Sequence, residues 1–298
     1  MSRLGPVQGL FEQGDLLISL GARLIEFDTG RFSLKLPQTH LQIVDSPEYP
    51  GTRFAPSLLL TGNVSSIAKE FLAQQKQSRT AWFDNAGASA REHARLQALD
   101  SDAYRAIELL RGALDRHDVV ANDQSILNYW ASAFFPVLEP RTFLYPAGSG
   151  TLGYGLPAAI GAAFAMQQDG SRHRVVCISG DGGFQYTLHE LATLKQHDLP
   201  VKILLVNDQA YGVIGFLQRS AFGQTYEVDL KNPDFCAGAQ AYGIPASRAT
   251  SFAELSQKLS SWLETPGPAL LEWRTQLKAP WEIGAIIRPA GISMKEQK

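Results

Sequence analysis

The sequence predicts an α/β protein built on parallel sheets. Two apolar, β-branched runs, 175–179 and 201–206, are typical of buried parallel strands, and the intervening segment 187–196 has apolar residues at helical spacing. A strand, a glycine-rich turn, a helix and a second strand in this order form a βαβ unit. Length and composition agree, because 298 residues with 45% apolar content suffice for one large domain or two.

The first part of the chain contains three short strand candidates, 15–22, 41–45 and 57–61, followed by a helix over 65–75. This pattern predicts a small parallel sheet in a first domain, 1–80. A sheet with so few strands leaves an edge strand and an apolar face without cover, which favours association with a partner chain.

The segment 81–103 carries many charges and no apolar stripe, and we interpret it as an interdomain linker. The second domain is then 104–298, which includes a tail after Lys278. Outside the βαβ unit, its expected elements are helix 104–114, strand 118–121, a helix ending near 130, helix 158–165, a helix beginning near 213, helix 252–263 and strand 269–273.

Charge and composition exclude several classes of partner. The formal net charge of −2 gives no electrostatic reason to expect nucleic acid or an anionic membrane. No apolar run reaches membrane-spanning length and the first residues lack the apolar core of a signal peptide, so we expect a cytoplasmic protein. Cys177 and Cys236 have neither paired-ligand spacing nor a secretory context, which argues against a zinc site or a disulfide.

Glycines and acids gather where the strands of the βαβ unit end. Gly182 and Gly183 directly follow Asp181, and such glycines let backbone amides approach an anion closely while the acid holds a hard cation. The second strand ends at Asp208, which should reach the same edge of the sheet. Two carboxylates at neighbouring strand ends can share one metal ion, so the sequence predicts a diphosphate site with Mg²⁺.

This pattern resembles the thiamine-diphosphate motif of the acetolactate synthase and 2-oxo acid decarboxylase family. The matching parts are Gly-Asp-Gly at 180–182, Asn-Asp at 207–208 and Tyr-Gly at 211–212, with similar segments at 190–193 and 199–203 between them. The resemblance implies the carboxyl half of such an enzyme, as in a split gene. It would contain a parallel-sheet, three-layer diphosphate-binding domain preceded by a partial Rossmann-like middle domain.

The same resemblance assigns roles to site residues. It implies a Mg²⁺ ion bound by the side chains of Asp181 and Asp208, the carbonyl of Ala210, two diphosphate oxygens and a water. The Gly150 carbonyl would accept a hydrogen bond from the exocyclic amine of the aminopyrimidine. Leu152 would wedge between the two rings of a bent thiamine diphosphate, bringing that amine near the reactive carbon.

Ser125 has two interpretations. Its hydroxyl could donate to a phosphate oxygen, or it could simply cap the helix that follows. The full set of expected cofactor-binding residues is Ser125, Gly150, Leu152, Asp181, Gly182, Gly183, Asp208, Ala210, Tyr211 and Gly212.

The resemblance implies the cofactor-binding subunit of a split enzyme that decarboxylates a 2-oxo acid and then protonates the product or joins it to a second carbonyl. We find no catalytic residue in this chain, and expect the activating glutamate on a pyrimidine-domain partner in a hetero-oligomer, with a heterotetramer as the expected form. Relatives generally carry an arginine and a tryptophan where this sequence has Gly215 and Leu217, which leaves the oxo acid and its acceptor open.

Two other functions fit parts of the sequence. A non-catalytic regulatory or binding subunit would also retain the diphosphate site. Gly148, Gly150 and Gly153 satisfy the dinucleotide pattern G-x-G-x-x-G, but the expected acid, Asp169, precedes the next strand instead of following it. Whether a flavin or an adenine nucleotide binds the middle domain, where Asp45 ends a strand, is also left open.

Overall fold

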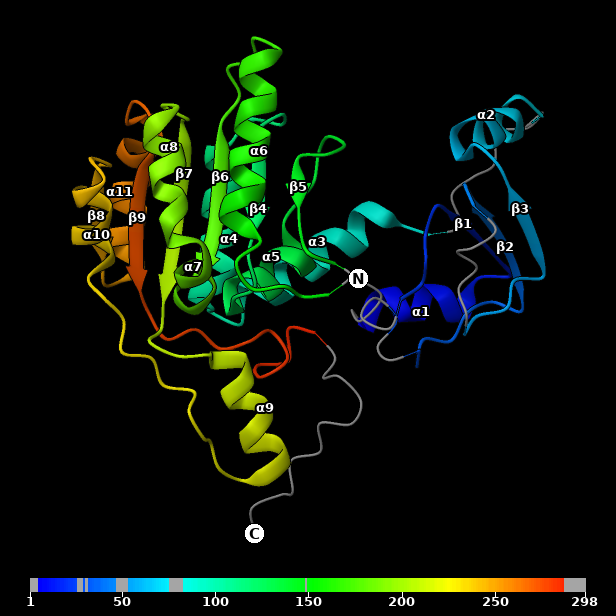
Figure 1. Ribbon diagram of the computed structural model, residues 1–298. Coiled ribbons are helices and arrows are strands. Elements are labelled where there is room, and N and C mark those ends of the chain that lie inside the picture. Colours follow the sequence, from blue (N-terminus) through cyan, green and yellow to red (C-terminus); the bar gives the residue numbers. More distant parts are fainter. Residues whose placement is uncertain are drawn as a thin grey trace. The chain divides into compact units, whose positions relative to one another are not determined.

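The computed structural model describes residues 5–25, 29, 32–46, 53–74, 83–147 and 149–286. The chain divides into two compact units, Met1–Leu99 with Gly284–Ile292 and Asp100–Ile283 with Ser293–Lys298. Each unit has a parallel sheet of its own (Figure 1). None of the helices in the described part of the chain has the length and apolar content that a membrane-spanning segment requires.

The smaller unit contains a three-stranded parallel sheet in the order β1-β2-β3. Its elements are β1 (Leu16–Leu20), β2 (Thr39–Val44), β3 (Leu58–Thr61), α1 (Gly5–Gln13), α2 (Val64–Gln74) and α3 (Asn85–Gln97). The three strands and helix α2 lie where the sequence predicts them. Ile43 is fully buried and pairs with Leu20 on one side and Leu60 on the other, so aliphatic residues of all three strands meet at the centre of the sheet.

Helix α3 fills most of the segment that the sequence analysis interprets as a linker. The helix begins after Asp84, whose carboxylate accepts a hydrogen bond from the amide of Gly87 at 2.8 Å and so caps the first turn. Several of its residues are alanines, which favour a helix because they lose no side-chain entropy. A search for apolar periodicity does not detect such a helix.

The larger unit contains a six-stranded parallel sheet in the order β5-β4-β6-β7-β9-β8. Its strands are β4 (Val119–Asn122), β5 (Phe143–Leu144), β6 (Val175–Gly180), β7 (Val201–Asn207), β8 (Ala246–Ala249) and β9 (Ala269–Arg274). Its helices are α4 (Asp102–Ala113), α5 (Ile126–Phe134), α6 (Gly155–Gln168), α7 (Asp181–Thr187), the 3₁₀ turn η1 (Leu188–Glu190), α8 (Leu191–Gln196), α9 (Gly212–Phe222), α10 (Phe235–Ala241) and α11 (Phe252–Glu264).

Helices cover both faces of this sheet and form a three-layer α/β fold, as predicted. Figure 1 shows α6 and α8 in front of the sheet and α4, α5 and α11 behind it. The front layer packs through small and branched residues, including Ala159 and Ala163 of α6 and Leu191 of α8. Strands β6 and β7 are buried along their whole length, as expected for central strands apolar on both faces.

The strand order brings three carboxyl ends together. Strand β6 pairs with β4 on one side and with β7 on the other, and Gly180 at the end of β6 lies opposite Val206 of β7. Because β4 connects outward to β5 while β6 connects to β7 in the opposite direction, the chain leaves a crevice at this edge of the sheet. Residues that follow β4, β6 and β7 therefore meet at one place.

Candidate functional site

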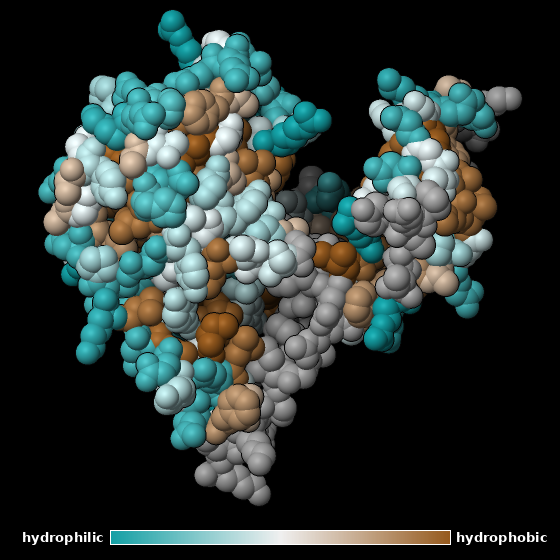
Figure 2. All heavy atoms as spheres, in the orientation of Figure 1, coloured by the Kyte–Doolittle hydropathy of each residue, from teal (hydrophilic) through white to brown (hydrophobic). Residues whose placement is uncertain are grey.

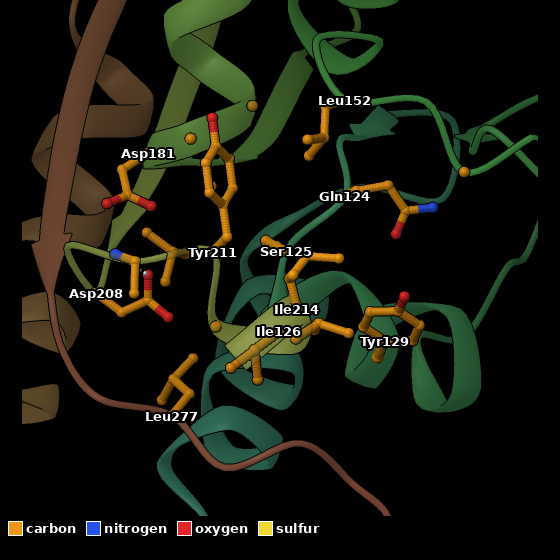
Figure 3. Close-up of a pocket in the computed structure, with 18 residues that line it drawn as sticks. Gln124, Ser125, Ile126, Tyr129, Leu152, Asp181, Asp208, Tyr211, Ile214 and Leu277 are labelled. Carbon is orange, nitrogen blue, oxygen red and sulfur yellow. Dashed lines mark hydrogen bonds between the residues drawn. The ribbon is translucent and has the colours of Figure 1, made fainter. Parts of the chain in front are cut away.

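A pocket lies at this carboxyl edge, and all of the cofactor-binding residues expected from the sequence line it (Figure 3). They come from the ends of β4, β6 and β7 and from the glycine-rich loop before α6. These residues are Ser125, Gly150, Leu152, Asp181, Gly182, Gly183, Asp208, Ala210, Tyr211 and Gly212. The assignment of a cofactor contact to each of them stays a prediction.

Asp181 and Asp208 bring two carboxyl groups into contact at the inner end of the pocket. Asp181 is only 2% exposed, and burial raises its pKa. Burial and the negative charge of Asp181 raise the pKa of Asp208 to about 7. The two carboxyl groups are thus close enough for the charge on one to disfavour ionisation of the other. A cation bound between two such acids would remove this repulsion.

Asn232 orients Asp181, and sequence reasoning missed it. Its side-chain nitrogen donates to Oδ2 of Asp181 at 2.5 Å and to Oδ1 of Asn207 at 3.1 Å. Asn207 in turn donates to Oε1 of Glu272 at 2.7 Å. Asn232 lies in an irregular segment between α9 and α10 with no motif around it, so the sequence contains no signal for this contact.

The motif glycines correct one structural expectation. Sequence reasoning places them in a turn before a helix at 187–196, whereas α7 begins at Asp181 itself and includes both Gly182 and Gly183. Close packing requires glycine here, because a Cβ on Gly182 would lie 2.5 Å from Cε1 of Tyr211. A Cβ on Gly212 would likewise lie 2.7 Å from Oδ2 of Asp208. The glycines thus let backbone and carboxylates approach the pocket.

The loop before α6 forms another wall. Gly150 has a left-handed φ of 60°, and a Cβ there would lie 3.1 Å from Nε2 of Gln124. Figure 3 shows the Leu152 side chain pointing from this loop into the pocket. Gly148, part of the alternative dinucleotide pattern, lies outside the described residues.

Ser125 acts as a helix cap in this structure. Its Oγ accepts a hydrogen bond from the amide of Asn128 at 3.1 Å, at the start of α5. This matches one of the two interpretations from the sequence. Accepting this bond does not use the hydroxyl proton, which can still be donated to a ligand, since a hydroxyl both donates and accepts.

Asp123 is a second residue that sequence reasoning missed. It follows β4, is fully buried, and accepts hydrogen bonds from the amides of Gly153 and Gly155 at 3.0 and 3.1 Å. The sequence shows an acid at a strand end here, but nothing in the sequence reveals which distant amides it binds.

The residues of the pocket fit a divalent cation with a diphosphate. The donor set is rich in carboxylate oxygen, which suits Mg²⁺. The glycines at 180, 182 and 183 line the pocket, and a Cβ at any of them would lie within 3.0 Å of a neighbouring side chain.

Comparison with protein families places this pocket in a known context. Residues 123–273 match the family model described as "Thiamine pyrophosphate enzyme, C-terminal TPP binding domain". The chain belongs to the thiamine pyrophosphate enzymes. Every expected cofactor-binding residue of this thiamine pyrophosphate enzyme falls inside the matched range.

Relatives of this thiamine pyrophosphate enzyme include acetolactate synthases. The chain is 31% identical over 274 residues to the acetolactate synthase large subunit of Cyanidium caldarium, with 87% of this chain and 46% of that protein covered. It is 34% identical over 268 residues to the acetolactate synthase isozyme 2 large subunit of Escherichia coli (strain K12), with 87% and 47% covered. The chain spans about half the length of the curated relatives it matches.

A solved structure confirms the fold. The benzoylformate decarboxylase of Polynucleobacter necessarius superimposes with a TM-score of 0.70 over 93% of this chain and 52% of its own. The sequence identity is 22%, so this likeness concerns the fold alone.

Proposed function

We propose that this chain binds the diphosphate and metal of a thiamine-diphosphate enzyme that decarboxylates a 2-oxo acid and then protonates the product or joins it to a second carbonyl, in an acetolactate synthase-like reaction. The observation that carries the proposal is the electrostatic interaction of the buried Asp181 with the half-buried Asp208, both of which line a glycine-rich pocket. Two neighbouring acids removed in part from water are unfavourable when both are ionised, and a shared divalent cation relieves that repulsion.

The metal and the diphosphate would lie at the ends of β6 and β7. The side chains of Asp181 and Asp208, with the carbonyl of Ala210, would supply the protein part of an all-oxygen Mg²⁺ shell. The amides of Gly182 and Gly183 belong to the first turn of α7, where backbone N–H groups have no partner within the helix, and they would bind diphosphate oxygens.

The opposite end of the cofactor would lie against the loop before α6. There the Gly150 carbonyl would accept from the aminopyrimidine, and the side chain of Leu152 would pack between the two rings. Bound thiamine diphosphate supplies the electron sink that stabilises negative charge on carbon when CO₂ leaves. The chain's own residues bind and orient it, and the apolar side chains of Ile126, Ile214 and Leu277 limit water in the pocket.

The activating acid is proposed to come from a partner. Among the described residues that line the pocket, the carboxylates are Asp181 and Asp208, and no glutamate is present. We therefore assign the glutamate to a pyrimidine-binding domain on a partner subunit, in a hetero-oligomer. Because Gly215 and Leu217 replace the arginine and tryptophan usual in acetolactate synthases, the substrate is assigned only as a 2-oxo acid.

Calorimetric titration of thiamine diphosphate, with and without Mg²⁺, tests the binding step. We expect binding that requires Mg²⁺ and that is lost in Asp181→Asn. The control Asp169→Asn changes an acid at the other end of α6 and should bind as the wild type does. Metal-independent binding, or unchanged binding in Asp181→Asn, would contradict the proposed function.

Release of CO₂ from 2-oxo acids tests the reaction. We expect turnover only after a pyrimidine-domain chain is added, and no turnover when that complex contains Asp181→Asn. Full activity of the isolated chain would contradict the partner requirement. If the assembled complex binds the cofactor but its rate of CO₂ release is the same with Asp181→Asn as with wild type, this subunit has a non-catalytic role.

A further inference from the structure

Asp123 makes an unusual number of hydrogen bonds for one buried acid. It is 0% exposed, and no ion pair of it occurs in the described part of the chain. Its Oδ1 accepts from the amides of Gln124 at 2.7 Å and Gly153 at 3.0 Å. Its Oδ2 accepts from the amide of Gly155 at 3.1 Å and from the hydroxyl of Ser179 at 3.4 Å.

These partners belong to three segments of the chain, each of which contributes residues to the lining of the pocket. Gln124 follows β4, Gly153 and Gly155 end the loop that contains Gly150 and Leu152, and Ser179 lies two residues before Asp181. Asp123 itself is not among the residues that line the pocket. Asp123 therefore lies behind the lining of the pocket and forms hydrogen bonds with all three segments.

Glycines make room for this carboxylate. A Cβ on Gly155 would lie 2.9 Å from Cβ of Asp123, and a Cβ on Gly183 would lie 2.9 Å from its Oδ1. Gly153 has a φ of 82°, and a Cβ there would also lie 2.9 Å from Cβ of Tyr186. A side chain at Gly155 or at Gly183 would therefore clash with Asp123, so these glycines let the loop and the first turn of α7 pack directly against it.

We propose that Asp123 is a positioning residue that fixes the Gly150–Leu152 loop relative to Asp181, so that the pocket binds the two ends of the cofactor at a set separation. This inference rests on the proposed function of the pocket. Its role depends on acceptor chemistry, because an ionised carboxylate accepts several N–H and O–H bonds at once. An asparagine would turn an NH₂ group toward these donors and leave at least one of them without an acceptor.

The test compares two ligands, one that contacts only the diphosphate end of the pocket and one that also contacts the loop. Inorganic pyrophosphate with Mg²⁺ needs only the metal and diphosphate residues, whereas thiamine diphosphate with Mg²⁺ also needs the loop. For Asp123→Asn we expect the affinity for thiamine diphosphate to fall about ten- to a hundredfold, as is usual for residues that orient a ligand-binding group, while the affinity for pyrophosphate stays within about twofold of wild type.

Asp118 provides a matched control. It is 1% exposed, lies at the amino end of the same strand β4, and accepts from the amides of Arg174 at 2.7 Å and Asp115 at 2.8 Å. Asp118→Asn should lower the thermal midpoint of unfolding but leave both affinities unchanged. A purely structural role for Asp123 would give it the same behaviour.

A milder variant covers the case in which Asp123→Asn does not fold. Ser179→Ala removes one donor to Asp123 and should weaken thiamine diphosphate selectively, by about two- to fivefold, the size expected for one hydrogen bond. Equal losses for both ligands, or no loss for either, would overturn the inference while leaving the proposed function intact. A wild-type chain that binds neither ligand would instead contradict the proposed function, and this inference with it.

Discussion

The carboxyl groups of Asp181 and Asp208, at the ends of the neighbouring strands β6 and β7, interact electrostatically: after burial, the charge of Asp181 is the main cause of the raised pKa of Asp208. The segment after β9 also contacts Asp208, because Nε2 of Gln276 donates to the backbone carbonyl of Asp208 at 2.7 Å. The backbone at Asp208 is thereby tied to the segment that follows β9.

The pH dependence of stability should report this pair. The pKa of Asp208, about 7 in the folded state, lies above its unfolded value of 3.8, so the folded state binds a proton that the unfolded state releases between these values. Stability of the metal-free protein should therefore fall as pH rises through this window, by about 1 kcal/mol between about pH 6 and about pH 8. Thermal unfolding measures this change, which should lower the midpoint temperature by about 2–4 °C for a unit of this size.

Asp208→Asn is the variant that checks the assignment. It removes one of the two charges, so the fall in stability with pH should flatten, and the metal-free protein should become more stable at the higher pH. A pH profile identical to that of the wild type would show that the pair is not the cause.

Gly182→Ala should weaken cofactor binding through sterics. The new Cβ would lie 2.5 Å from Cε1 of Tyr211, so the ring must leave its position in the pocket. We expect a loss of about tenfold or more in affinity for thiamine diphosphate, equivalent to about 1.4 kcal/mol, measured by calorimetry. Gly161→Ala is the control, because nothing lies within 4 Å of its Cβ position in α6, and there alanine should stabilise the helix slightly.

Asn232→Ala should lower the affinity for Mg²⁺ without placing any new atoms in the metal site. The hydrogen bond from Asn232 lowers the pKa of Asp181, so its loss should raise that pKa and shift the midpoint of Mg²⁺ binding to higher pH. A hydrogen bond to a charged group contributes about 1.5–3 kcal/mol, so affinity near neutral pH should fall by about tenfold or more. Gln185→Ala, which loses only a 3.4 Å contact with Oδ1 of Asn232, should leave Mg²⁺ titrations unchanged.

Arg248→Met should destabilise the larger unit. Arg248 donates to Oε2 of Glu272 at 2.5 Å and to Asp234 at 2.7 Å, and it lowers the pKa of the buried Glu272. Removing it leaves that carboxylate with less compensation, at a cost of about 2 kcal/mol because Arg274 still contacts it. The lowered pKa of Glu272 means that this stability is present above its unfolded pKa and disappears as pH falls.

Denaturant unfolding at two pH values measures the effect of Arg248→Met. The difference from wild type should be larger near neutral pH than in mild acid. Arg172→Met serves as the control, since Arg172 is exposed and forms no ion pair among the described residues. Equal stability losses for the two variants would argue against the Glu272 network.

Much of the fold follows from local patterns. The apolar runs that become β6 and β7 are continuous in sequence, and a buried parallel strand needs only such a run. Helix α3 and the short strand β5 escaped prediction, because alanine-rich helices and two-residue strands have no distinctive periodicity. The start of α7 at Asp181 escaped too, since glycines usually indicate a turn.

The positions of Asp181 and Asp208 along the chain are enough to predict that they approach each other, because each follows a strand and parallel neighbours end at the same edge of a sheet. Two other contacts are visible only in the folded chain: Asn232 donates to Asp181, and Asp123 accepts from the amides of Gly153 and Gly155. These contacts join residues about 30 to 50 positions apart through irregular segments. The direction of a side chain there depends on the packing of the whole unit, which no local pattern encodes. Figure 2 shows apolar side chains at the surface in the region of α9, and Ile214, Leu217 and Phe222 of this helix are exposed.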